Sequence, residues 1–139
     1  MIQQDYILRI IREFMEALQL FVSRQKDIKK KEEKILELYT TYVGDPVFYH
    51  TAAMDDVMDS FTQWPVEERL YRMEMLAELY YAETEIKTGP TRDLLLERAM
   101  QMFLFIDRHS RTFSIERQSK IRQIQEAMDK NVSESKTTN

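Results

Sequence analysis

Two long apolar segments between Trp64 and Ser110 constrain the fold of this 139-residue chain more than any other feature. The first repeats apolar residues every three or four positions, which places them on one face of an α-helix. The second is apolar on nearly every side, as in a helix buried at the centre of a protein. Gly89 and Pro90 are expected to end the first helix, and Thr91 to cap the second. The stretch therefore predicts two central helices that fold back on each other.

The rest of the chain predicts helices that surround this pair. Residues 5–22 carry an apolar stripe between charges of both signs, typical of a helix that packs on a core. The charged run 24–34 follows, and it fits either a bend between two helices or one continuous helix. After an irregular link, a short helix is expected from Thr51, and Ser114 can cap a last helix with a narrow apolar stripe. The polar tail 131–139 lacks an apolar period and is expected to be disordered.

Composition agrees with a single helical domain. Two glycines and three prolines leave few residues for the many turns of an all-β protein, and the length suits one domain. We therefore expect residues 1–130 to form one all-α domain, either a helical bundle or a short α-α superhelix of five to six helices. The absence of cysteine excludes disulfides and thiolate chemistry.

Net charge and hydropathy limit where the protein is expected to be located and which classes of partner it is expected to bind. A formal net charge of −4 argues against nucleic acid, whose binding depends on clustered cations. No segment reaches the roughly 18 to 20 apolar residues of a membrane-spanning helix. The amino terminus lacks the basic and apolar regions of a secretory signal. These patterns predict a cytoplasmic protein without a membrane span.

The sequence contains no motif for catalysis, for a cofactor or for a metal ion. Neither glycine belongs to a phosphate-binding loop, and neither His50 nor His109 belongs to an HExxH or Glu-x-x-His pair. Glu74 and Glu78 share a helix face, but no histidine lies beside them in the sequence. We therefore expect a protein that is not an enzyme. A pocket with several carboxylates and a histidine would favour an enzyme instead.

Tyr81 and three acidic neighbours are the candidate partner-binding residues. Tyr81 lies about 100° around the helix from Tyr80, which belongs to the apolar face. It can therefore be exposed beside Glu74, Glu78 and Glu85. An exposed aromatic ring among carboxylates could bind a basic peptide. Alternatively, Tyr81 packs against a neighbouring helix.

These residues predict a protein-protein interaction or scaffold module, with a protein or peptide partner. Two alternatives stay open. One is a structural homo-oligomer, such as a homodimer formed through the apolar stripe of the first helix. The other is a small-ligand-binding or enzymatic site in a helical cleft.

The two central helices resemble a tetratricopeptide repeat. The first helix of that repeat has a large apolar residue, a small one and then an aromatic one, which here are Leu76, Ala77 and Tyr80. The second has a small residue and an aromatic one four positions later, here Ala99 and Phe103. The two alanines lie farther apart than in the repeat, and no second copy is present. The resemblance implies a helical hairpin in which the alanines let the two backbones approach.

Two segments, residues 3–14 and 68–83, are similar to an uncharacterised family of bacterial, Bacteroides-like all-helical proteins. The resemblance covers most of the chain. It implies a bacterial cytoplasmic helical protein, and it brings no activity and no catalytic residue.

Overall fold

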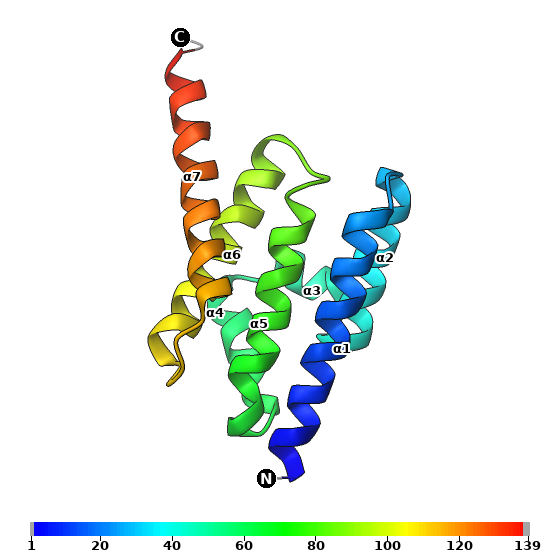
Figure 1. Ribbon diagram of the computed structural model, residues 1–139. Coiled ribbons are helices and arrows are strands. Elements are labelled where there is room, and N and C mark those ends of the chain that lie inside the picture. Colours follow the sequence, from blue (N-terminus) through cyan, green and yellow to red (C-terminus); the bar gives the residue numbers. More distant parts are fainter. Residues whose placement is uncertain (1, 138–139) are drawn as a thin grey trace.

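The computed structural model describes the backbone of residues 2–137 and the side chains of residues 5–133. Between residues 2 and 137 the fold is all-α, with seven α-helices, one 3-10 helix and no strand (Figure 1). In chain order the elements are α1 (Ile2–Arg24), α2 (Ile28–Tyr42), α3 (Pro46–Thr51), α4 (Met54–Ser60), η1 (Phe61–Gln63), α5 (Val66–Glu83), α6 (Gly89–His109) and α7 (Ile115–Thr137).

Helices α5 and α6 form the centre of the molecule. They make the most extensive contact between any two elements, α1 and α2 pack on α5, and α7 packs on α6 (Figure 1). The packing of α5, α6 and α7 is consistent with a helical bundle. The central position predicted for these two segments is confirmed, because their side chains supply much of the buried core.

The core takes large side chains from every long helix. Fully buried examples from α1, α2, α5, α6 and α7 are Phe14, Tyr39, Tyr80, Phe103 and Ile124. Aromatic rings meet edge to face within this core, as Phe14 and Tyr42 do at 5.3 Å between ring centroids. The expected core position of Tyr80 is confirmed.

Helices α1 and α2 are separate, which settles the alternative that the sequence left open. The charged run contains a helix start at Asp27, whose side chain accepts a hydrogen bond from the backbone N–H of Lys30 at 3.2 Å. A side chain in this role satisfies one of the unpaired N–H groups of the first helical turn. The bend therefore follows from capping within the run.

The expected number of five to six helices is too low. Residues 46–63, expected to be a link followed by one helix, form α3, α4 and η1. Asp45 caps α3 by accepting from the backbone N–H of Val47 at 3.0 Å, and Pro46 occupies the first turn. Thr51 ends α3 and does not start a helix. The Asp-Pro pair starts a helix here, within the segment that was expected to be an irregular link.

The boundary between the central helices also differs from the prediction. Helix α5 ends at Glu83, and Gly89 and Pro90 lie in the first turn of α6, so they do not terminate α5 and Thr91 does not cap α6. Proline suits a first turn because its missing N–H has no intrahelical partner there. Gly89 has a φ of 63°, a left-handed conformation that glycine adopts without strain.

Helix α7 starts where the sequence predicted, after Ser114, and continues beyond the predicted end of the helix. Ser114 caps it by accepting from the backbone N–H of Arg117 at 3.1 Å. The helix then runs to Thr137, through most of the segment expected to be disordered. Asn131 connects it to α6, accepting from Arg92 at 3.4 Å and donating to Asp93 at 2.8 Å. Contacts with α6 therefore reach Asn131, the first residue of the segment that lacks an apolar period.

Candidate functional site

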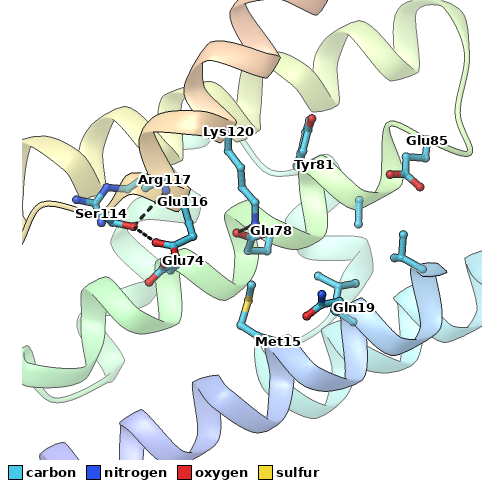
Figure 2. Close-up of a pocket in the computed structure, with 13 residues that line it drawn as sticks. Met15, Gln19, Glu74, Glu78, Tyr81, Glu85, Ser114, Glu116, Arg117 and Lys120 are labelled. Atoms are coloured by element: carbon cyan, nitrogen blue, oxygen red, sulfur yellow. Dashed lines mark hydrogen bonds and ion pairs between the residues drawn. The ribbon is translucent and has the colours of Figure 1, made fainter.

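The four residues chosen from the sequence line one pocket of about 530 Å³ between α1, α5 and the start of α7. Figure 2 shows Glu74, Glu78, Tyr81 and Glu85 along α5, with Met15 of α1 on one side and α7 on the other. We call this pocket the α5 groove. The spacing of three and four residues explains why these side chains share a face of α5.

The wall of the α5 groove on the side of α1 is apolar except for Gln19. Helix α1 contributes Met15, Leu18 and Val22, which are spaced by three and four residues, and Ala82 of α5 lies beside them. Leu18 is buried, whereas Met15 and Val22 are half-buried against the core. The groove therefore combines an apolar wall on α1 with a row of carboxylates on α5.

The two carboxylates Glu74 and Glu78 lie one turn apart and have different surroundings. Glu78 is buried and accepts a charged hydrogen bond from Nζ of Lys120 on α7. Glu74 is half-buried and has no hydrogen-bond or ion-pair partner among the side chains of residues 5–133. Glu85, at the other end of the row, is exposed. The groove thus contains negative charge that the folded chain does not neutralise.

Burial makes Glu74 and Glu78 harder to ionise than ordinary glutamates. Loss of solvation raises the pKa of Glu74, and the charge of Glu78 raises it further, against the opposing effect of Arg117 and Lys120. Loss of solvation also raises the pKa of Glu78 even though Lys120 opposes the shift. An additional positive charge in the groove would therefore be favourable.

Tyr81 lies at the groove and also contacts α7. Its ring is half-buried, and its hydroxyl donates to Oε1 of Gln123 at 2.8 Å. Part of the side chain therefore packs against a neighbouring helix, while part of it lines the groove. Its role in binding a partner stays a prediction.

Several groove residues were not identified from the sequence. They come from α1 and from the start of α7, and include Met15, Leu18, Glu116, Arg117 and Lys120. Arg117 is buried and donates to Oδ1 of Asp107 at 3.1 Å and to the Thr112 carbonyl at 2.9 Å. The charged faces of α7 were visible in the sequence, but no local signal indicates which of its cations meets α5.

A second pocket of about 340 Å³ contains His50 and the buried Glu83. Nε2 of His50 lies 2.7 Å from Oε1 of Glu83, and the hydroxyl of Tyr39 donates to the same oxygen. These contacts join α2, α3 and α5 around one buried carboxylate. The neighbouring carboxylate in the pocket, Glu32, pairs with Lys87 at 3.2 Å.

Arg98 connects the second pocket to the end of α3. It is buried, and it donates to the backbone carbonyls of Tyr49 at 3.1 Å and of Ala52 at 2.6 Å. The hydroxyl of Tyr80 also donates to the Tyr49 carbonyl, at 2.6 Å. The last carbonyls of a helix lack intrahelical donors, so this arrangement satisfies the end of α3. The second pocket is therefore bordered by groups already committed to holding the fold together.

Among the residues that the structure describes, no group of three or more His, Asp and Glu side chains is placed to hold a metal ion. Within the same part of the chain, no helix is long and apolar enough to cross a membrane.

Comparison with protein-family models, with curated proteins and with solved structures finds no match for this chain. The all-helical character is shown by the structure itself. The resemblances to a bacterial family and to a tetratricopeptide repeat stay predictions, as do the homodimer, the cytoplasmic location and the enzymatic cleft.

Proposed function

We propose that this chain is a protein-interaction module whose α5 groove binds a basic amphipathic helix of a partner protein. The observation that carries the proposal is the combination of an apolar wall on α1 with the unpaired carboxylates Glu74 and Glu85 on α5. Aromatic residues and methionine are enriched in protein interfaces, whose apolar core is surrounded by a polar rim. Tyr81 supplies an aromatic ring to the lining of the groove.

The charges of the groove favour a cationic partner. Four carboxylates line it, and of its two cations Arg117 is held by Asp107 and Lys120 by Glu78. A partner cation near Glu74 would offset the cost of a carboxylate that burial makes difficult to ionise. Complementary charge also accelerates encounter between partners and excludes acidic competitors.

The shape of the groove favours a helix over an extended peptide. Its walls are two helices, α1 and α7, on either side of α5 (Figure 2). An amphipathic helix can place apolar residues at positions i, i+3, i+4 and i+7 into a groove of this kind. Met15, Leu18 and Val22 present the same spacing on α1, so apolar side chains of the partner would interdigitate with them. Extended peptides more often add to sheet edges, and residues 2–137 form no strand.

The test is binding of a fluorescent leucine-lysine peptide that forms an amphipathic helix as long as α5, 18 residues. The substitution Glu74→Gln should weaken binding roughly three- to five-fold, because a partly exposed ion pair contributes up to about 1 kcal/mol. Fluorescence anisotropy measures the affinity. Glu97→Gln, which removes the same charge from an exposed position on α6 outside the groove, is the matched control.

The same substitution should raise the melting temperature at neutral pH. The pKa of Glu74 is higher in the folded than in the unfolded chain, so its ionised form opposes folding above the folded-state pKa. The gain in melting temperature from Glu74→Gln should shrink as the pH falls through the raised folded-state pKa. It should vanish below the pKa of an ordinary glutamate.

A loss of affinity with no loss of stability would identify Glu74 as a binding residue. Equal affinity of the Glu74→Gln and Glu97→Gln proteins, or equally tight binding of a leucine-glutamate peptide, would refute the proposed site.

We further propose that α5 and α6 pack as a tetratricopeptide-like hairpin with close contact at Ala77 and Ala99. The full burial of both alanines, and of Tyr80 and Phe103, supports this packing. Replacing Ala77 with leucine should then lower the free energy of unfolding by roughly 1 to 3 kcal/mol, because the extra carbons overpack a dense core. Urea denaturation measures the change, with the exposed Ala53→Leu as control. An unchanged midpoint for Ala77→Leu would reject the close contact.

A further inference from the structure

Lys120 already occupies part of the α5 groove. It extends from α7 toward α5, where its ammonium contacts the carboxylate of Glu78 (Figure 2). The side chain of Glu78 is 7% exposed and that of Lys120 is 23% exposed. The deepest carboxylate of the groove is therefore neutralised by a cation that can still be reached from solvent.

The position of α7 makes this contact easy to exchange. Helix α7 packs on α6, and it meets α5 through Lys120 and through the hydrogen bond between Gln123 and Tyr81. A lysine side chain is a flexible four-carbon stem with a strongly hydrated charge, so it can turn into water without moving the helix. Glu78 without its cation is an unpaired buried carboxylate unless it takes up a proton. Displacement of Lys120 is therefore most favourable for a group that brings a cation of its own.

We infer that Lys120 is an internal substitute for a cation of the partner, and that binding replaces one with the other at Glu78. The inference rests on the proposed function of the groove. It specifies the partner as a helix with a lysine or arginine between the apolar residues of its binding face. Lys120 then competes with the partner and lowers its apparent affinity.

The substitution Lys120→Met tests this competition with the same leucine-lysine peptide. It keeps an apolar stem and removes the charge, so the peptide should bind roughly five-fold more tightly than to the unmodified protein. Lys130→Met removes the same charge from an exposed position farther along α7 and should change the affinity less than two-fold. Lys120→Arg, which retains the competing charge, should bind the peptide as the unmodified protein does.

A second measurement does not depend on any variant folding correctly. Peptide added to the unmodified protein, labelled with ¹⁵N and ¹³C, should move the NMR signals of the Lys120 ammonium to the values of a solvent-exposed lysine. The Lys130 signals should stay in place.

The outcomes separate the two proposals. If the unmodified protein binds the peptide and Glu74→Gln weakens binding, but Lys120→Met binds no more tightly and the Lys120 signals do not move, the exchange is refuted and the groove function stands. If the Lys130→Met protein gains as much affinity as the Lys120→Met protein, general charge explains the gain and the exchange is again refuted. If the unmodified protein does not bind the peptide, both proposals fail.

Discussion

Replacing Arg98 with methionine is expected to lower the free energy of unfolding by about 3 kcal/mol. The guanidinium donates to the carbonyls of Tyr49 and Ala52 at the end of α3, and hydrogen bonds from a charged group contribute about 1.5 to 3 kcal/mol each. In the variant, the hydroxyl of Tyr80 still donates to the Tyr49 carbonyl. The Ala52 carbonyl loses the hydrogen bond from Arg98, and no other donor in the described part of the chain replaces it. Methionine retains a flexible apolar stem that can pack as the arginine stem does. The decrease in the free energy of unfolding therefore measures the lost hydrogen bonds more than lost packing.

Thermal and urea denaturation measure this change. For a chain of this length 1 kcal/mol corresponds to about 3 to 5 °C, so the melting temperature should fall by roughly 10 °C. Arg108→Met is the matched control, because Arg108 is an exposed arginine on the same helix, and it should stay within about 0.5 kcal/mol of the unmodified protein. If both variants melt at the same temperature, Arg98 does not hold α3 in place.

Replacing Phe14 with alanine is expected to cost about 3 to 5 kcal/mol, the usual range for a large aromatic residue in a core. Its ring is fully buried in the core beneath α1, and it meets the ring of Tyr42 edge to face at 5.3 Å between centroids. Phe14 belongs to the buried face of α1, the helix that packs on α2 and α5. Its loss should also loosen the apolar wall of the α5 groove, so binding of the leucine-lysine peptide should weaken.

Urea denaturation followed by circular dichroism measures the stability, and anisotropy measures the binding. Leu20→Ala is the control on the same helix, because Leu20 is exposed, and it should change the free energy of unfolding by less than about 0.5 kcal/mol. A loss for Phe14→Ala no larger than that of the control would mean that α1 does not pack on the core through this ring.

The sequence predicted much of the fold where local rules govern it. Apolar spacing identified the central helices, and Ser114 was recognised as a cap because a serine side chain can accept from the first turn wherever the helix lies. The same rules predicted the wrong helix boundaries at Asp45-Pro46 and Gly89-Pro90, which both lie at helix starts. Both pairs can end one element or begin the next, and the choice depends on what the flanking residues pack against.

The candidate site was predicted only on its α5 side. Glu74, Glu78, Tyr81 and Glu85 share a helix face, and their spacing shows this without any coordinates. The apolar wall on α1 could not be assigned, because its stripe could equally have faced another helix or a second molecule. Lys120 could not be assigned either, because it meets Glu78 from 42 positions away.

The sequence by itself determined that this protein is all-α, that α5 and α6 are central, and that one face of α5 is acidic. These properties depend on residues within a few positions of one another, where helix geometry sets which side chains are neighbours. Only the tertiary structure decided that α1 and α7 enclose that acidic face, and that Lys120 neutralises Glu78 while Glu74 stays unpaired. The register between packed helices is set by the fit of side chains distant in the chain, which periodicity does not record.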